Sequence, residues 1–451
     1  MNNLNETVDL ITEEMLSSEQ KLAIDEVFKG NNLFIQGQAG TGKSTFIKYL
    51  QDYSTKNIVL CSPTAVAAIN IGGTTLHSLF KLPISDFIAT ETISKTNRKQ
   101  IIPVIEKIEI LIIDEISMVR PDMLDAIDTI CRRARGIRKP FGGIQTILIG
   151  DLYQLPPIIK KDTVELFFNK YGTTEPYFFD SKVYKTGNFK KFEFTKCFRQ
   201  DDKELLDNLL KIRNRTDLTS AIDYFNQCKI QDNDILEKAV VITPYRDVAE
   251  QINTLKLNKL LGKITKYEAK LKGSFERALN ESSFPTQKTL FFKEGALVMF
   301  NKNDKNKMWI NGSLGIIKEL FPNKIKVELL SGVEVEVTRE CWESKEYKTE
   351  EEFVVDVETN QMIKKQKLVE NITGTFKQFP LQLGYACTIH KAQGKTLDKV
   401  SIDLNRGAFA HGQLYVALSR TRRKEDINLI SNISTRDVIF KNRVVEYLET
   451  I

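Results

Sequence analysis

The stretch GQAGTGKS, Gly37–Ser44, constrains the fold of this chain more than any other. It matches the pattern G-x-x-x-x-G-K-[ST] in full, and it stands directly after the apolar run NNLFIQG, Asn31–Gly37, and before a helical pattern. A phosphate-binding loop needs this strand–loop–helix context, because its backbone N–H groups must converge on one anion at the start of a helix. The context therefore favours a phosphate loop over a plain glycine-rich turn.

Each residue type within this loop has a physical reason. Gly40 and Gly42 allow the backbone to curl so that its N–H groups surround the phosphates. The Lys43 side chain reaches the β- and γ-phosphate oxygens, and the Ser44 hydroxyl is a ligand for Mg²⁺. The loop therefore predicts a bound nucleoside triphosphate with Mg²⁺. The residues expected to contact this nucleotide are Gly37, Gly40, Thr41, Gly42, Lys43, Ser44 and Thr45.

A pair of acids ends a second apolar run. In ILIIDEISM, Ile110–Met118, four apolar residues carry Asp114 and Glu115 to the end of a predicted strand. We expect Asp114 to hold the Mg²⁺ ion and Glu115 to polarise the attacking water. Acids at strand ends are often only solvated turn residues, but a phosphate loop one strand away favours the catalytic interpretation. NKND, Asn301–Asp304, fits a guanine-reading pattern, yet it lies far from this sheet and is interpreted as a polar turn, so ATP is favoured over GTP.

Two arginines far apart in the chain are predicted to stabilise charge at the γ-phosphate. Arg199 lies in KCFRQ, and Arg420 lies in QLYVALSR. Arginines are often ordinary surface residues, but phosphoryl transfer requires cations beyond the lysine of the phosphate loop. If both arginines act on one nucleotide, ATP binding draws two parts of the chain together, which predicts a motor rather than a passive ATPase.

Apolar runs alternate with helical patterns over the first third of the chain, which predicts an α/β fold. Continuous apolar strands are typical of a parallel sheet covered by helices on both faces. A later set of such runs predicts a second α/β unit. Between them, short runs punctuated by NG, PN and SG predict a small antiparallel β-barrel, and the charged stretch Glu343–Lys367 is expected to form an exposed excursion or hairpin. The expected parallel strands are Asn31–Gly37, Lys56–Ser62, Lys107–Glu115 and Ile144–Asp151, then Lys238–Pro244, Leu383–Ile389, Lys399–Leu404 and Ile427–Ser431.

The totals set limits on the fold and on its partners. A chain of 451 residues is expected to form more than one domain. Its net charge of +6 is compatible with a polyanionic partner but is too small to demonstrate one. The six cysteines are scattered without CxxC pairs, which indicates free thiols in a reducing compartment. The sequence shows neither a signal peptide nor a membrane-spanning run, so we expect a protein of the cytoplasm.

Several motifs together resemble the petite integration frequency (PIF) family of superfamily-one helicases. The most specific is MLDAIDTICRRARGIRKPFGGIQ, Met123–Gln145, which is similar to the segment that separates this family from its RecD-like relatives. The resemblance runs from about Leu16 to Ser431, with one departure at Ala65, where the family usually has glycine. The other matching motifs are LSSEQKLAI, SPTAVAAINIGGTTLHSLF, IDEISM, GDLYQLPP, YACTIHKAQGKTL and QLYVALSRTR.

This resemblance implies an α/β architecture of two RecA-like parallel-sheet domains. A small wedge is inserted in the first domain, and a Src-homology-three-like β-barrel is inserted in the second. The expected boundaries are residues 1–195 for the first domain with the wedge at about 82–105, residues 196–294 and 376–451 for the second domain, and residues 295–375 for the barrel.

The resemblance also assigns nucleotide roles to glutamines of this chain. Gln20 is expected to read adenine, and Gln154 is expected to sense the γ-phosphate at the tip of its strand. Gln393 and Gly394 are expected to face the nucleotide and to couple it to nearby DNA contacts. The stiff apolar segment Leu155–Pro157 is expected to lie against bases or the DNA-side wall.

A DNA path follows from the same resemblance. A translocating motor grips the nucleic-acid backbone through hydroxyls, amides and cations without reading sequence. Lone histidines such as His77 and His390 are usually structural hydrogen-bonding groups, and it is the resemblance that favours DNA contact; His411 receives no role. Trp309 is expected to pack within the barrel rather than stack on a base. The expected DNA-binding residues are Pro63, Thr64, His77, Asn311, Thr388, His390 and Lys391.

The implied activity is ATP-driven 5′-to-3′ translocation on single-stranded DNA with unwinding of forked duplexes, and many relatives also unfold G-quadruplexes. We expect a monomer, with a dimer on DNA as the alternative, no membrane partner, and a place near the nucleoid of a bacterial or phage-infected cell. Two other functions stay open: an RNA-acting helicase with the same core, and an ATP-gated single-stranded DNA clamp that does not unwind. Intact Lys43, Glu115 and Arg420 argue against the clamp.

Overall fold

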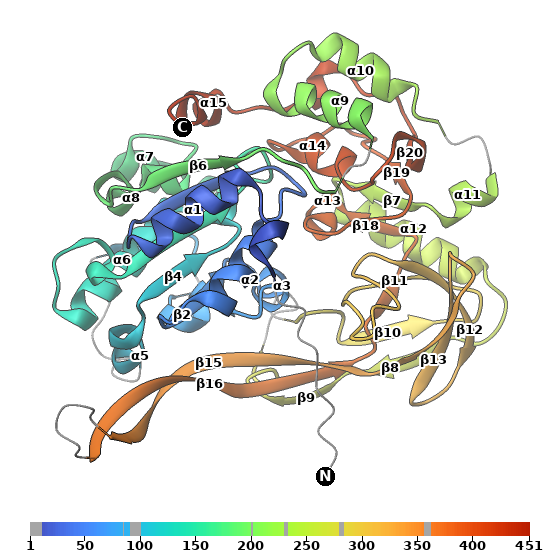
Figure 1. The fold of residues 1–451 in the computed structure, drawn as a ribbon. Coiled ribbons are helices and arrows are strands. Elements are labelled where there is room, and N and C mark those ends of the chain that lie inside the picture. The colour runs from blue at the N-terminus through green and yellow to red at the C-terminus, as the bar shows by residue number, and fades with distance from the viewer. Residues whose placement is uncertain are drawn as a thin grey trace.

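In the computed structural model, two parallel sheets stand side by side above an antiparallel region and a long hairpin (Figure 1). The structure describes residues 11–83, 85–90, 101–199, 202–229, 233–278, 284–355 and 362–451. Within these ranges no helix has both the length and the apolar character needed to cross a membrane.

The first sheet has six parallel strands in the order β3-β2-β4-β5-β1-β6. Its central strands β4 and β5 are buried along their whole length, as continuous apolar runs predict. The loops that follow β1, β4 and β5 meet at one edge because these strands are parallel and adjacent. The strands are β1 (Leu33–Gly37), β2 (Ile58–Ser62), β3 (Thr74–Thr75), β4 (Ile110–Ile113), β5 (Gln145–Gly150) and β6 (Lys190–Phe194).

Helices cover both faces of this first unit. On one face α1 and α2 pack on alternate strand residues such as Ile112 and Ile149, and on the other face α4, α5, α6 and α8 pack on Leu111 and Leu148. A turn at Pro140–Gly143 leads from α6 back into β5. The helices are α1 (Ser18–Phe28), α2 (Lys43–Tyr53), α3 (Ala65–Asn70), α4 (Leu76–Phe80), α5 (Ile102–Lys107), α6 (Pro121–Arg135), α7 (Val164–Tyr171) and α8 (Lys182–Thr186).

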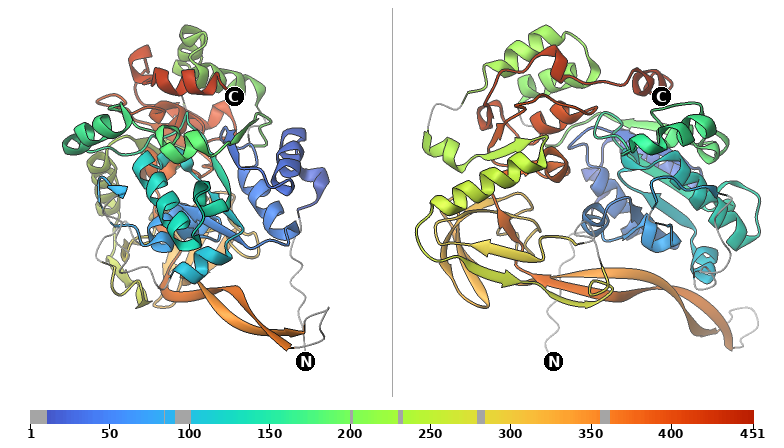
Figure 2. Two further views of the ribbon diagram at one scale, coloured as in Figure 1. Left: turned by 90° about the vertical axis from the view of Figure 1, so that its left-hand side faces the viewer. Right: turned by 180° about the vertical axis from the view of Figure 1, so that it is seen from behind.

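The second sheet has four parallel strands in the order β18-β7-β19-β20, so the prediction of a second α/β unit is confirmed. The last helix, α15, leaves this unit and packs on the first, where Val444 is fully buried in the first unit's core (Figures 1 and 2). The strands are β7 (Val240–Thr243), β18 (Ala386–Thr388), β19 (Val400–Ile402) and β20 (Ile427–Leu429). The helices are α9 (Lys203–Asn214), α10 (Leu218–Asn226), α11 (Asn233–Lys238), α12 (Arg246–Lys259), α13 (Ile389–Ala392), α14 (Gln413–Leu418) and α15 (Asn442–Leu448).

The antiparallel region reaches beyond the expected limits of 295 and 375. Its main sheet has the order β14-β13-β12-β11-β17, while β8, β9 and β10 lie before residue 295. These early strands were missed because stretches such as TKYE and KLKG are short and charged, which is atypical of strands. The strands are β8 (Thr265–Glu268), β9 (Lys270–Gly273), β10 (Thr289–Phe292), β11 (Leu297–Phe300), β12 (Leu314–Leu320), β13 (Lys324–Leu329), β14 (Glu334–Thr338) and β17 (Leu381–Leu383).

A long hairpin of β15 (Glu340–Val355) and β16 (Met362–Gln378) confirms the hairpin expected in the charged stretch. It runs from the antiparallel region beneath the first unit (Figures 1 and 2). The Lys81–Glu346 ion pair of 2.5 Å and the packing of Tyr347 on the first unit's core hold it there. In the expected wedge, residues 84 and 91–100 lie outside the described residues.

Candidate functional site

The loops that follow β1, β4 and β5 converge on a cavity of about 540 Å³ that also receives residues from the second unit. The cavity brings together thirteen of the fifteen residues predicted to act on the nucleotide. Gly37 and Gln393 are not among its lining residues, but each contacts one that is. The lining residues that were predicted are Gln20, Gly40, Thr41, Gly42, Lys43, Ser44, Thr45, Asp114, Glu115, Gln154, Arg199, Gly394 and Arg420.

The phosphate loop itself has the form that its sequence predicts. Gly42, at φ +76°, precedes α2, so the first N–H groups of that helix are directed to the loop. The Lys43 amine donates to the carbonyl oxygens of Gly37 at 2.7 Å and Gln38 at 3.0 Å. Burial lowers the pKa of Lys43, and the nearby Asp151 and Glu115 carboxylates oppose that change. A buried amine among backbone N–H groups suits a phosphate ligand.

The segment that carries Arg199 lies directly on the phosphate loop. Phe198 N–H donates to the Gly40 carbonyl at 2.8 Å, and a Cβ at Gly40, which has φ +82°, would overlap the Cβ of Arg199. Burial lowers the pKa of Arg199, and its Nη1 is buried without a hydrogen-bond partner in the described chain. Because buried cationic donors are normally paired, this nitrogen is well suited to an anionic ligand in the cavity.

Asp114 and Glu115 lie at the end of β4 and face the same cavity. Burial raises the pKa of Asp114. Burial and then the Asp114 charge raise the pKa of Glu115 to about 7. Two acids held together in this way are suited to a cation, and the oxygens of Asp114 and Ser44 are the hard ligands that Mg²⁺ prefers. Mg²⁺ takes few protein ligands and uses phosphate and water oxygens for the rest, so the residues present fit this ion.

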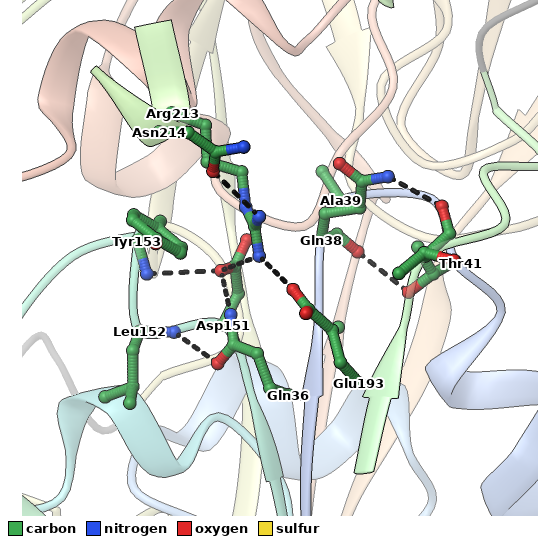
Figure 3. Close-up of polar contacts among 12 residues, drawn as sticks. Gln36, Gln38, Ala39, Thr41, Asp151, Leu152, Tyr153, Glu193, Arg213 and Asn214 are labelled. Atoms are coloured by element: carbon green, nitrogen blue, oxygen red, sulfur yellow. Dashed lines mark hydrogen bonds and ion pairs between the residues drawn. The ribbon is translucent and has the colours of Figure 1, made fainter. Parts of the chain in front are cut away.

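Asp151 is the centre of a buried polar network at the end of β5 (Figure 3). Its carboxylate accepts hydrogen bonds from Gln36 Nε2 at 2.8 Å and from Tyr153 N–H at 3.1 Å. It also accepts from Gln154 Nε2 at 3.0 Å, while Gln154 lines the cavity. The Gln154 amide is therefore held by Asp151 rather than left free to turn.

The segment Leu155–Pro157 was expected to lie against bases or the DNA-side wall, and for the Leu155 side chain this expectation is wrong. Leu155 is 1% exposed and packs with Tyr153 in the core of the second unit. The chain leaves the tip of β5 directly into the boundary between the two units, where an apolar side chain gains more by burial than by facing a solvated groove. This segment is therefore a contact between the units, beside the nucleotide cavity.

Sequence reasoning missed three residues of the second unit that reach the first. His411 Nε2 donates to the Leu152 carbonyl at 2.8 Å, while its Nδ1 accepts from the Lys441 N–H, which fixes the tautomer. The Tyr415 hydroxyl accepts from the Ala39 N–H of the phosphate loop at 3.4 Å. Arg213 lies beside Asp151. Each contact joins residues more than 50 positions apart in the chain, so no local sequence pattern predicts such a contact.

Arg420 is almost fully buried at the cavity wall. Four of its five N–H groups donate to protein acceptors, which leaves one on Nη2 for a ligand. Burial, and then the charge of Arg199, lower its pKa to about 9. The neighbouring Gln393 donates to the Glu115 carboxylate at 3.3 Å, so the second unit directly contacts one of the two acids that follow β4. The acceptors of Arg420 are the carbonyls of Val416, Ala392 and Lys395 and the hydroxyl of Ser419.

Gln20 lies at the cavity, but its amide already has protein partners. Its Oε1 accepts from Ser17 N–H at 2.8 Å in a capping box at the start of α1. Its Nε2 donates to the carbonyls of Thr41 at 3.2 Å and Gly42 at 3.1 Å. Both N–H groups are thus engaged with the phosphate loop, and adenine reading by Gln20 stays a prediction.

Residues 15–234 match the family model of the PIF1-like helicase. The ATP-dependent DNA helicase Pif1 of Bdellovibrio bacteriovorus is 30% identical over 436 residues, which cover 96% of this chain and 91% of that protein. The chain belongs to the PIF1-like helicase family. A Bacteroides sp Pif1 structure in complex with ADP-AlF4 matches with TM-score 0.83, 35% identity and 96% of both chains covered. Bacteroides Pif1 bound to ssDNA matches over the same shares with TM-score 0.68.

Two of the DNA-binding residues predicted from this PIF1-like family resemblance, Thr64 and Thr388, have similar places in the two units. Thr64, after Pro63 and β2, caps α3 by accepting from Ala67 N–H at 3.2 Å. Thr388, at the end of β18, caps α13 by accepting from Lys391 N–H at 3.3 Å. Their DNA contacts stay a prediction, as those of Pro63 and Lys391 do.

Of the remaining candidates, the two histidines lie in or near these helices, while Asn311 lies in the antiparallel region. His77 is in α4 and His390 is in α13, and burial lowers the pKa of both. Asn311 precedes Gly312, which packs so closely on the Thr396 carbonyl that a Cβ would overlap it. Trp309 packs on Phe300 with ring centroids 4.6 Å apart, so the prediction of packing is confirmed.

Proposed function

We propose that this chain is an ATP-dependent DNA helicase that translocates 5′ to 3′ on single-stranded DNA and unwinds forked duplexes. The observation that carries the proposal is the single cavity that joins the phosphate loop and acid pair of the first unit to Arg420 of the second. The names of the relatives support it, since they are ATP-dependent DNA helicases, and a Bacteroides relative has been seen bound to ssDNA.

In the proposed hydrolysis, the loop N–H groups and Lys43 bind the β- and γ-phosphates. Ser44 and Asp114 would hold Mg²⁺, which supplies charge neutralisation between those phosphates. Glu115, whose pKa is raised to about 7, is poised to polarise the attacking water and to accept its proton. Arg199 and Arg420 offset the charge that develops on the γ-phosphate.

Coupling to DNA is proposed to run through α13. Its first turn carries Thr388, His390 and Lys391, and the residue directly after it, Gln393, donates to Glu115. Loss of the γ-phosphate changes the charge facing Glu115 and Arg420, so it changes the position that α13 prefers relative to the first unit. A cycle of such shifts, with DNA held by Thr64 in one unit and Thr388 in the other, moves the strand.

The test is strand displacement with ATP on two duplexes that are identical except for a 5′ or a 3′ single-stranded tail. We expect displacement from the 5′ tail alone, and ATPase stimulation by poly-dT well above that by poly-U. Displacement from the 3′ tail would contradict the polarity, and stimulation mainly by poly-U would contradict DNA as the substrate. Robust ATPase without displacement from either tail would contradict unwinding. The 5′-tailed substrate with a G-quadruplex ahead of the tail then measures whether such structures are also unfolded.

A further inference from the structure

Arg213 belongs to the second unit, yet its guanidinium lies inside the polar network of the first (Figure 3). Its Nη2 is 3.8 Å from Asp151 Oδ1 and 3.2 Å from Glu193 Oε1, and its guanidinium carbon lies 4.1 Å from the centroid of the Tyr153 ring. The residue as a whole is 5% exposed. The rest of α9 packs in the second unit's core through Leu209 and its neighbours, so Arg213 joins the two units.

A fully buried carboxylate such as Asp151 requires a nearby cation, because removing an unpaired charge from water is costly. Two cations share this role. Lys43 is one, since Asp151 is the strongest of the carboxylates that oppose the lowering of the Lys43 pKa. The phosphates of a bound nucleotide would pair with the Lys43 amine, which then neutralises less of the Asp151 charge. Arg213 is not among the residues that line the cavity, so a nucleotide in the cavity is not placed to compete with Asp151 for it.

The Asp151 carboxylate in turn decides which way the Gln154 amide faces. A carboxylate only accepts hydrogen bonds, so the Gln154 NH₂ group must point toward it, as the 3.0 Å contact requires. The carboxamide oxygen then lies on the opposite side of the same amide. Because Gln154 lines the cavity together with Glu115, an acceptor at this position suits one hydrogen of the attacking water while Glu115 takes the other.

We propose that Arg213 is a positioning residue: from the second unit it anchors the Asp151 carboxylate and so keeps the Gln154 oxygen turned to the attacking water. The inference rests on the proposed ATP hydrolysis and adds a residue that acts without touching nucleotide. It makes turnover depend on how the second unit sits on the first, since a shift of α9 withdraws the anchor. Two contacts from the second unit, Arg213 with Asp151 and Gln393 with Glu115, would thus both influence the position of the attacking water.

The test measures DNA-stimulated ATP hydrolysis by the full chain and five variants. In Arg213→Met the anchor is lost, and we expect kcat to fall about 10- to 100-fold while KM for ATP stays within about threefold. Arg213→Lys retains a charge but not the planar guanidinium that lies between both acids and the Tyr153 ring, so it should recover part of the loss. Glu193→Gln is the matched control, because it removes the other, partly exposed partner of Arg213; its kcat should stay within about twofold of the parent.

A double variant separates positioning from general stabilisation. If Arg213 acts through Gln154, Arg213→Met combined with Gln154→Ala should be no slower than Gln154→Ala alone. Multiplied losses, or an unchanged kcat in Arg213→Met, would overturn the inference. If Arg213→Met does not fold, Asp151→Asn replaces it and must show the same kcat loss at constant KM; a normal kcat overturns the inference equally. Failure of the proposed function is distinct, since the unmodified chain would then show no DNA-stimulated hydrolysis.

Discussion

The two parallel-sheet units share a threonine-capped helix that follows a strand, but they contribute different chemical groups to the nucleotide cavity. In each, a threonine at or just after the end of a strand caps a short helix, with Thr64 before α3 in the first unit and Thr388 before α13 in the second. The first unit also carries the phosphate loop and the acid pair, whereas the second contributes Arg420 to the same cavity. The difference is the basis of our proposal that the first unit binds nucleotide and that the second completes the site for turnover.

This comparison makes a general prediction about variants. Changes in the phosphate loop should remove ATP binding together with ATP hydrolysis, because the loop provides the N–H groups and the amine that are proposed to hold the phosphates. Changes in the side chains that the second unit contributes should spare binding and lower kcat. Changes at the threonine caps should weaken DNA binding and leave nucleotide affinity unchanged.

The largest effect is expected for Lys43→Ala. The amine that contacts the phosphates is lost from a buried site, so DNA-stimulated ATP hydrolysis should fall at least about 1,000-fold, measured as steady-state phosphate release. Lys29→Ala is the control, since Lys29 forms an exposed ion pair of 2.9 Å with Glu26 away from the cavity. Retained turnover in Lys43→Ala would contradict the nucleotide site itself.

Gly40→Ala should break the contact by which the Arg199 segment lies on the phosphate loop. A Cβ at Gly40 overlaps the Cβ of Arg199, so we expect kcat for ATP to fall about 10- to 100-fold. Gly30→Ala is the matched control, because Gly30 has a similar φ of +86° but open space around its Cβ position. Both variants should lose about 1 kcal/mol of stability through backbone strain. Equal ATPase activities in the two variants would show that the overlap has no consequence.

The contact of His411 with Leu152 predicts a pH dependence of stability at the boundary between the units. Burial lowers the pKa of His411 to about 4 from 6.5, so the neutral form is favoured in the folded chain and the unfolded chain takes up a proton first. The contribution of neutral His411 to the free energy of unfolding is complete above pH 6.5 and is lost as the pH falls toward 4. At pH 5 the loss is about 2 kcal/mol. His411→Gln should flatten the fall in thermal midpoint between pH 7 and pH 5. A slope equal to that of the parent chain would contradict a neutral buried histidine.

The smallest effects are expected at the threonine caps. Thr64→Val and Thr388→Val should each weaken single-stranded DNA binding a few-fold, measured by fluorescence anisotropy, and cost about 1 kcal/mol through the lost cap. Thr75→Val is the matched control, because Thr75 caps α4 in the same way, accepting from Ser78 N–H at 3.1 Å. Nucleotide affinity should be unchanged in all three. A loss of DNA affinity in Thr75→Val as large as in the other two would assign the effect to capping alone.

The nucleotide cavity could be predicted because its residues stand in short contiguous motifs at the ends of apolar strands. The phosphate loop and the Asp114–Glu115 pair follow β1 and β4, and a parallel sheet brings such loops together without further information. Arg213 could not be predicted in this way. Its role depends on how α9 lies against β5 and β6, and that packing is set by the tertiary fold. The same reason explains Leu155, whose apolar side chain was predicted to face DNA and is buried between the units instead.

We propose that the second unit completes a site whose binding groups lie in the first, and replacing Arg420 removes the group on which this proposal depends. The measurement is steady-state ATP hydrolysis at saturating single-stranded DNA for Arg420→Ala and Arg420→Lys. Because the Arg420 guanidinium also donates to four protein acceptors, the thermal midpoint of Arg420→Lys is measured as well, to show that this variant is folded. We expect kcat to fall about 1,000-fold while KM for ATP stays within about threefold. A folded Arg420 variant with unchanged kcat would contradict this proposal, because the first unit would then hydrolyse ATP without the second.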